Sequence, residues 1–280
     1  WPADYHIVGK EIVRFHSIIW PAMLMSLELP LPKHVFGHGW LLLDGGKMSK
    51  SKGNVVDPYI LAERFGVDAL RFFLLRTFPF GSDGNFSNEA LIQTINVDLA
   101  NDLGNLVSRT TAMNQKYFGS VLTAGGELAE LDNELKQLSD EVVANYEKHM
   151  DGFQFSNALA EVFRLLDRAN KYIDETTPWI LAKNPETMPR LGTVLYNLLE
   201  AIRFAAIALE PYLPDTSKRI LEQLNIGNGG LESLTSFGML PSGIKVGAGE
   251  ILFARLDMAK KMEEIEAFNA EKAKAALPPL

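Results

Sequence analysis

From about residue 87 onward, apolar residues recur at intervals of three and four, and this pattern constrains the fold more than any other feature of the chain. The spacing places apolar side chains along one face of an α-helix. It predicts five helices, marked from Ser87, Leu131, Ser156, Leu191 and Asp215 onward. Because helices with one apolar face bury those faces against each other, the sequence predicts a helix bundle here.

The chain before residue 87 has a different pattern. Ile7-Val8 is followed by Gly9 and then by apolar residues at helical spacing from Ile12 to Ile19. That order predicts a strand, a turn and a helix, as in an α/β unit. A second strand is expected from Val35 to Leu43.

Local start and stop signals divide the chain further. Asp57-Pro58 combines an acceptor side chain at the N-cap with proline at the first helical position, and Gly66 is expected to end that helix. Asp68 is expected to open the next helix. The cluster Pro79, Gly81, Asp83 and Gly84 predicts a linker, which is the clearest domain boundary in the sequence.

Composition limits the chemistry. The 280 residues include 27 basic and 35 acidic side chains, a formal net charge of −8, so any contact with nucleic acid must use local clusters rather than bulk charge. The absence of cysteine excludes disulfides, thiolate zinc sites and a cysteine nucleophile. Neither a membrane span nor a signal peptide is expected. Because the first residue is Trp1 rather than methionine, we expect the chain to be part of a longer protein.

The segment 45–54 has the composition of an anion-binding loop. It holds Lys47, Lys50 and Lys52 with two serines between glycines. Glycines let the backbone approach a phosphate, and ammonium and hydroxyl groups bind its oxygens. The spacing is not that of a P-loop. On composition alone, a solvated lysine-rich turn remains an equal alternative.

The order of residues in this loop carries a family resemblance. Lys47-Met48-Ser49-Lys50-Ser51 is identical to the second signature of class I aminoacyl-tRNA synthetases. The wider sequence resembles the methionyl-tRNA synthetase family in several segments: Gly9–His16, Trp20–Leu24, His38–Trp40, Gly53–Pro58, Asn105–Arg109 and Pro178-Trp179.

The resemblance implies a fold class: an α/β remnant of a Rossmann-type catalytic domain plus a mostly α-helical anticodon-binding bundle. It implies four regions, namely the end of the catalytic domain (1–36), the lysine-serine loop with a stem-contact region (37–85), the bundle (86–260) and a tail or linker (261–280). The first class I signature and the cysteine-bearing zinc insertion are absent from the sequence. We therefore expect this chain alone not to activate methionine.

The resemblance also implies a reaction. Methionine and ATP, taken with Mg²⁺, form methionyl-adenylate, and the acyl group then passes to the 3′ end of tRNA(Met). Lys50 is expected to be the main catalytic and ATP-binding lysine and Lys47 the second, because charge on the leaving pyrophosphate grows in the transition state. Ser49 and Ser51 are expected to shape the loop or donate hydrogen bonds. No protein metal site is expected in this chain.

Three further residues are implied at the nucleotide. Gly9 and Glu11 would lie against the adenosine ribose, and His38 beside the nucleotide. The family more often has aspartate where this chain has Glu11. The alternatives are a surface acid at a helix start for Glu11 and a hydrogen-bonded histidine at a strand end for His38.

Two residues are implied at the methionine side chain. Ile12 and His16 are four apart and share one helical face. In the family these positions line the methionine pocket. The alternative is that His16 is a core histidine with satisfied hydrogen bonds.

Four residues are implied at the anticodon. Asn105 and Arg109 project from one helical face, Trp179 offers a ring on which a base can stack, and Pro178 sets the backbone beside it. The alternatives are a solvated polar pair and a partly buried tryptophan.

Two rival functions stay open on the sequence alone. One is a class I synthetase for leucine, isoleucine, valine or cysteine. The other is a non-catalytic tRNA-binding fragment. A cytoplasmic location without membrane contact is expected, as is a homodimer formed through a C-terminal module outside these residues.

Overall fold

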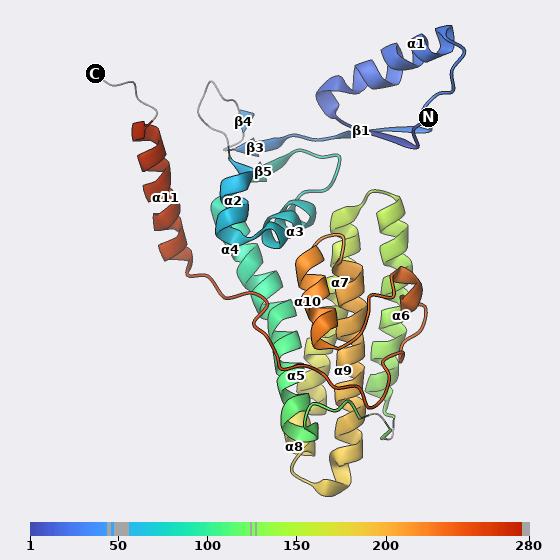
Figure 1. Cartoon of the computed structure of the whole chain (residues 1–280), viewed down its shortest axis with the longest axis vertical. Coiled ribbons are helices and arrows are strands. Elements are labelled where there is room, and N and C mark those ends of the chain that lie inside the picture. Colours follow the sequence, from blue (N-terminus) through green and yellow to red (C-terminus); the bar gives the residue numbers. More distant parts are fainter. Residues whose placement is uncertain (44–45, 48–55, 124, 127, 276–280) are drawn as a thin grey trace.

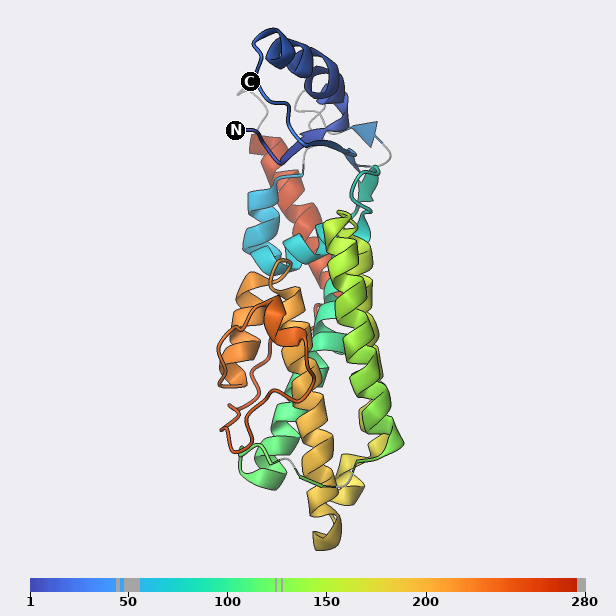
Figure 2. The ribbon, with the colours of Figure 1, turned by 90° about the vertical axis from the view of Figure 1, so that its right-hand side faces the viewer.

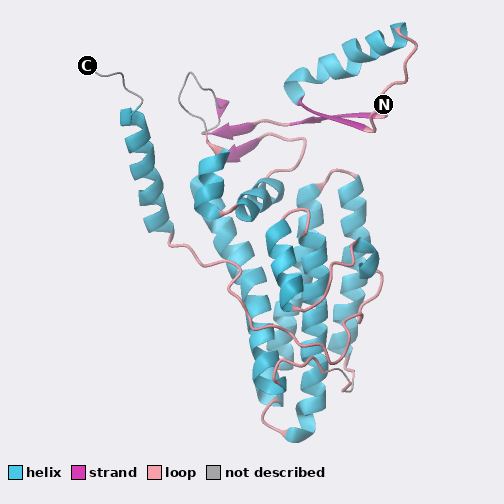
Figure 3. Ribbon diagram, in the orientation of Figure 1, coloured by secondary structure: helices cyan, strands magenta, loops and turns pink. Residues whose placement is uncertain are grey.

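The computed structural model describes residues 1–43, 46–47, 56–123, 125–126 and 128–275. The molecule is elongated, with a small sheet and its helix at one end and a helix bundle filling the rest (Figures 1 and 2). The strands lie at the same end of the molecule as α1, and helices make up most of the rest (Figure 3). The expected fold class is confirmed: two small sheets, each with a parallel strand pair, and their helices precede a mostly helical region.

The first unit is a strand, a helix and a strand. β1 (Tyr5–Gly9) leads through a 3₁₀ turn (Lys10–Ile12) and a π-helical turn (Phe15–Ile19) into α1 (Trp20–Ser26), and β2 (His34–His38) follows. β1 and β2 pair in parallel, with Gly9 opposite His38. One face of this sheet is covered by the helix, since a Cβ at Gly37 would overlap the Val13 side chain.

The strand expected from Val35 to Leu43 is divided in two. β3 (Leu41–Leu43) begins after a break at Gly39, where a Cβ would overlap the Ser82 carbonyl. Glycine is therefore needed at this close approach of two backbone segments. β3 pairs antiparallel with β4 (Gly46–Lys47) and parallel with β5 (Gly84–Phe86).

Two short helices connect the sheets to the bundle. α2 (Pro58–Phe65) begins as expected, with the Asp57 carboxylate accepting the Tyr59 N–H at 3.0 Å. Gly66, at φ +87°, separates it from α3 (Val67–Thr77). Asp68 does not cap its own helix: its buried carboxylate accepts the N–H and the hydroxyl of Thr216, both at 2.7 Å. It thus caps a helix 148 residues further along the chain.

The bundle begins with one long helical run. α4 (Asn88–Thr94) is capped by Ser87, continues through a π-helical stretch (Ile95–Gly104) and ends as α5 (Asn105–Phe118). Gly119 closes it at φ +60°. The other elements are α6 (Glu130–Asp151), α7 (Phe155–Thr176), α8 (Pro178–Leu181), a 3₁₀ turn (Pro185–Thr187), α9 (Met188–Leu209), α10 (Pro214–Gln223) and a second 3₁₀ turn (Leu231–Leu234).

α9 is the central helix of the bundle. Its length and composition would suffice for a membrane span over Pro185–Leu209, but 94% of the relevant window is buried inside the protein. It packs on α5, α6, α7 and α10. Burial within the bundle accounts for its apolar character.

The hydrophobic core crosses the boundary expected near residue 85. Leu61 and Phe73, from before it, belong to one continuous cluster with Leu198 of α9. The division into four regions stays a prediction. The four regions follow the sequence pattern, whereas the continuous hydrophobic core packs α2 and α3 together with the bundle helices.

The C-terminal segment runs back along the bundle and ends in α11 (Met258–Ala275) (Figure 1). The Asn96 amide anchors it, donating to the Leu256 carbonyl at 2.9 Å and accepting the Leu256 N–H at 2.7 Å. The Arg64 guanidinium lies 4.2 Å from the centre of the Phe268 ring, so α11 packs beside α2. The tail expected from residue 261 is therefore helical as far as Ala275.

Candidate functional site

Gly9, Glu11 and His38 meet at the carboxyl ends of the two parallel strands. Gly9 and His38 are partners in the strand register. The Glu11 carboxylate folds back over Gly9 so closely that a Cβ at Gly9 would overlap it. In open α/β sheets, ligands bind at this edge. The three residues that the sequence assigned to the nucleotide thus lie at one edge of one sheet.

His38 is held in a fixed orientation. Its Nδ1 lies 3.0 Å from the Gly39 carbonyl oxygen, and its ring stacks on Phe80 with centroids 5.9 Å apart. Because a carbonyl oxygen only accepts, Nδ1 carries the proton in this contact, and Nε2 has no hydrogen-bond partner among the described residues. The alternative of a hydrogen-bonded strand-end histidine and the nucleotide role are therefore compatible.

The turn after α3 is attached to this edge, which the sequence did not reveal. Lys10 Nζ and the Trp40 N–H both contact Asp83 Oδ1, at 2.5 and 2.8 Å. The Gly84 N–H donates to the Trp40 carbonyl at 2.9 Å. The segment expected to be a linker is thus fixed to the end of the sheet. The available signal was Asp83 between two glycines, which predicts a turn but names no partner.

The lysine-serine signature starts on β4, in the second small sheet. Lys47 lies on β4, opposite Leu42 of β3. Ser49, Lys50 and Ser51 lie outside the described residues. Their roles stay predictions from the sequence.

A cavity of about 340 Å³ opens between the sheet and its helix. Its walls come from seven residues, five of them aromatic or histidine rings: Trp1, His6, Phe15, His16, Ile19, Trp20 and Met23. Such an aromatic wall suits a small, mostly apolar ligand.

His16 belongs to this wall, and Ile12 does not. The His16 Nδ1 contacts the Ile12 carbonyl oxygen at 3.0 Å, and its ring meets His6 edge-on at 5.8 Å. Ile12 lies one turn earlier, with 39% of its surface exposed. The His6 Nδ1 is buried and has no hydrogen-bond partner within the described part of the chain. The sequence missed His6.

Asn105 and Arg109 lie exposed, one turn apart, on α5. The Asn105 amide donates to Asn101 Oδ1 at 3.1 Å, and Arg109 is 3.7 Å from Asp174 of α7. Both side chains of this ion pair are largely exposed, so it is weak and leaves the guanidinium accessible.

Trp179 lies just beyond Asp174, on α8. Thr177 joins α7 to α8 with φ +45°, a conformation that strains a β-branched residue. Pro178 is buried, whereas Trp179 is 43% exposed. Strained backbone that presents an exposed ring is typical of functional surfaces. Through Asp174, the structure brings Arg109 close to the α7–α8 junction, at the end of the bundle remote from the β1–β2 sheet (Figures 1 and 2).

Two family profiles match the chain in succession. Residues 2–111 match class I tRNA synthetases of the methionine type, and residues 122–273 match the anticodon-binding domain of methionyl-tRNA ligase. The chain belongs to the methionyl-tRNA ligase family. This assignment sets aside the rival synthetases for other amino acids.

Individual relatives agree with the profiles. The chain is 58% identical over 279 residues to the methionine–tRNA ligase of Caldanaerobacter subterraneus subsp. tengcongensis, covering 98% of this chain and 43% of that protein. It is 53% identical over 270 residues to that of Bacillus subtilis, covering 95% and 40%. The chain thus spans about two fifths of the length of these relatives.

Solved structures show the same fold. Methionyl-tRNA synthetase of Mycobacterium tuberculosis in complex with methionyl-adenylate superimposes with a TM-score of 0.87 at 40% identity, covering 91% of this chain and 50% of that one. The free form of the same enzyme gives a TM-score of 0.84 at 37% identity, covering 92% of this chain and 50% of that one.

Over the described residues, no group of three or more His, Cys, Asp or Glu side chains is placed to hold a metal ion.

Proposed function

We propose that the complete protein carrying this chain is a methionine–tRNA ligase. The observation that supports this most directly is the meeting of Gly9, Glu11 and His38 at one edge of a sheet whose helix-covered face holds the His16 cavity. A nucleotide at the edge and an amino acid in the cavity would be neighbours. The family membership and the adenylate complex of the M. tuberculosis relative support the same pairing.

In the first step, the methionine carboxylate attacks the α-phosphorus of ATP, and pyrophosphate leaves. Glu11 would accept hydrogen bonds from the ribose hydroxyls, and His38 would present Nε2 to the nucleotide. Lys47 and Lys50 would neutralise the charge that grows on the leaving pyrophosphate, with Mg²⁺ arriving as part of the ATP substrate. Ser49 and Ser51 would shape the loop around the phosphates.

The methionine side chain would enter the cavity beside His16. The aromatic wall matches its thioether, since sulfur makes favourable contacts with aromatic rings. A pocket of this kind discriminates by shape, because one methylene is worth only about 1–3 kcal/mol. Ile12 lies one turn before His16 and outside the residues that line the cavity, so it would act through its contact with His16.

In the second step, a 3′-terminal ribose hydroxyl of tRNA(Met) takes the acyl group from the adenylate, and AMP leaves. Asn105 and Arg109 would hydrogen-bond anticodon bases, and Trp179 would stack on one of them, with Pro178 fixing its backbone. We further propose a cytoplasmic location, where methionine, ATP and tRNA occur together. A homodimer is proposed as well, and sedimentation of the complete protein tests it.

The reaction is tested by methionine-dependent exchange of pyrophosphate with ATP in the complete protein. We expect Lys50→Ala to lower the exchange rate by about 10²-fold and to leave methionine affinity unchanged, because its contact strengthens in the transition state. Lys52→Ala is the matched control, with the same charge removed from the same loop. Absence of exchange in the unsubstituted protein would favour a non-catalytic tRNA-binding role.

A further inference from the structure

The second face of the β1–β2 sheet carries a row of rings, of which the proposed reaction uses only His38. In a strand, alternate residues point to the same face. In the parallel register Tyr5 lies opposite His34, so both side chains point to this second face. Phe36 and His38, the next alternate residues of β2, point to the same face. The opposite face, with His6, is the one that holds the cavity.

These rings continue into the bundle. Phe80, from the turn after α3, stacks on Phe36, with ring centroids 4.9 Å apart and ring planes 5° from parallel. The His38 ring also stacks on Phe80, with centroids 5.9 Å apart. Phe153, from the turn between α6 and α7, lies 5.0 Å from Tyr5 and 5.1 Å from Phe36. We call this set the aromatic row: His34, Tyr5, Phe153, Phe36, Phe80 and His38.

Phe153 is the member of the row that the bundle supplies. The turn that carries it lies at the end of the bundle facing the sheet (Figure 1). Its ring touches both strands, and it also meets Phe80 at 6.3 Å and Phe155 of α7 at 5.7 Å. One side chain thus links the α6–α7 hairpin to the sheet whose edge carries His38.

The backbone of Phe153 is strained to place this ring. Its φ is +56°, in the left-handed region, while the preceding Gly152 has an ordinary φ of −86°. A sequence chosen for an unstrained turn would put glycine at the left-handed position. Here glycine stands one residue earlier, and an aromatic residue occupies the costly conformation. The ring at this position therefore does something that the turn itself does not require.

We propose that Phe153 is a positioning residue, which fixes the angle between the bundle and the sheet so that one tRNA reaches both ends of the molecule. This rests on the proposed function, because it assumes that the anticodon binds near Trp179 and the 3′ end is acylated near His38. The two regions lie at opposite ends of the molecule (Figures 1 and 2). A small change in the angle between the sheet and the bundle would displace the far end of the bundle several times further than the residues of the aromatic row.

The test compares three activities of the complete protein carrying Phe153→Gly. This variant removes the ring and relieves the left-handed strain, so the turn itself is expected to stay folded. We expect the transfer of methionine to tRNA to fall by tenfold to about a hundredfold, the range that a misplacement of about 1 Å produces. Pyrophosphate exchange and tRNA affinity should stay within about twofold of the unsubstituted protein, because neither requires both ends of the tRNA to be placed at once.

Two further variants separate positioning from folding. Phe153→Tyr keeps the ring and should restore most of the transfer rate. Asn225→Gly relieves another left-handed residue, at φ +55°, without touching the row, and should leave all three activities unchanged.

Two results would overturn the proposal. One is unchanged transfer by Phe153→Gly. The other is a parallel fall of exchange, transfer and thermal unfolding temperature, which would mean that Phe153 supports the fold. Failure of the unsubstituted protein to charge tRNA would instead count against the proposed function.

Discussion

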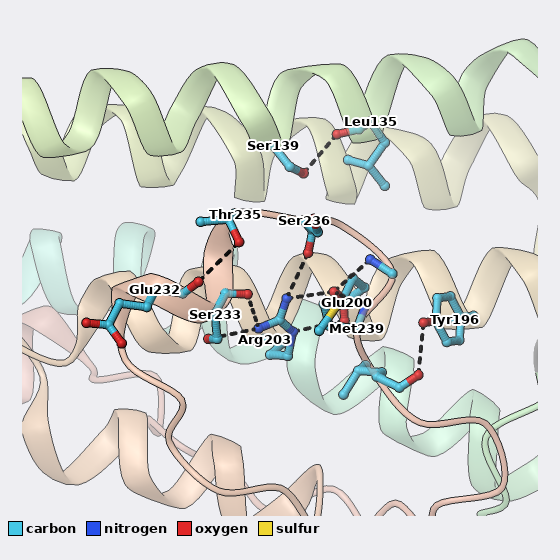
Figure 4. Close-up of polar contacts among 12 residues, drawn as sticks. Leu135, Ser139, Tyr196, Glu200, Arg203, Glu232, Ser233, Thr235, Ser236 and Met239 are labelled. Carbon is cyan, nitrogen blue, oxygen red and sulfur yellow. Dashed lines mark hydrogen bonds and ion pairs between the residues drawn. The ribbon is translucent and has the colours of Figure 1, made fainter.

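Glu200 and Arg203, one turn apart on α9, show how a single pair of side chains can organise a long irregular segment. Glu200 is fully buried, and its carboxylate takes two hydrogen bonds from Arg203 at 2.7 and 3.0 Å. Its Oε1 also accepts the N–H groups of Gly238 and Met239, both at 2.9 Å (Figure 4). Arg203 bonds the Ser233 carbonyl at 3.1 Å. The pair therefore fixes the glycine-rich chain after α10 to the central helix.

This geometry gives a prediction at the scale of the residue. Arg203→Met should lower the free energy of unfolding by about 3–5 kcal/mol, because it leaves the Glu200 charge buried without its partner. The double variant Glu200→Gln, Arg203→Met should lose clearly less, since no uncompensated charge remains. Urea denaturation of the three proteins measures both values. Equal losses in the single and double variants would show that packing, rather than charge, dominates here.

At the scale of the element, one carboxylate joins three helices. Asp132, in the first turn of α6, accepts the Ala129 N–H at 2.7 Å and binds Arg190 of α9 in a bidentate pair at 2.6 and 2.9 Å. The Tyr172 hydroxyl of α7 donates to the same carboxylate. Burial disfavours the charged form of Asp132, but the hydrogen bonds from Arg190 and Tyr172 outweigh it and hold the Asp132 pKa below its usual value.

The lowered pKa of Asp132 predicts a pH dependence of stability. A carboxyl group whose pKa is lower in the folded state stabilises the fold fully above its unfolded pKa, about 3.9, and loses this contribution as pH falls below that value. We therefore expect the free energy of unfolding to drop below about pH 4. Asp132→Asn should cost about 1.5–3 kcal/mol at pH 7 and flatten the acid limb. Urea midpoints measured from pH 7 to pH 3 check this, and an equally steep limb in the variant would contradict it.

The elements also show what the sequence can and cannot reveal. The caps Asp57 and Gly66 were predictable because each acts on its own helix within a few residues. The π-helical stretch was not predicted from the sequence. The apolar residues that run into it and through it do, however, recur strictly every four positions: Leu91, Ile95, Leu99 and Leu103. On an α-helix that repeat drifts by about 40° per step, and a wider turn reduces the drift. All four side chains are accordingly buried.

Long-range contacts explain most of what the sequence missed. Asp68 caps a helix 148 residues away, and Asp83 binds Lys10 across 73 residues. Nothing local distinguishes such carboxylates from ordinary helix-start or turn acids. For the candidate site, the resemblance selected Gly9, His38 and His16, which the fold does bring to one sheet. It could not select His6 or Phe153, whose partners become visible only when strands and helices are placed in space.

At the scale of the whole molecule, the β1–β2 sheet and α8 lie at opposite ends. Substitutions at one end should therefore affect one step of the proposed reaction and leave the other step unchanged. Trp179 lies on α8, far from the β1–β2 sheet (Figure 1). On the proposed function, its ring stacks on an anticodon base, and such a contact is worth about 1–3 kcal/mol. Trp179→Ala should therefore lower kcat/KM for tRNA charging by about 10- to 100-fold while pyrophosphate exchange stays unchanged.

The neighbouring Ile180 supplies the matched control for this prediction. It is 53% exposed on the same short helix but has no flat ring, so Ile180→Ala tests loss of apolar surface without loss of stacking. We expect Ile180→Ala to charge tRNA within about threefold of the unsubstituted protein, the effect of a partly exposed aliphatic contact. Similar charging defects in both variants would make α8 a packing element. Equal losses of exchange and charging in Trp179→Ala would mean that the ring supports the fold rather than tRNA binding.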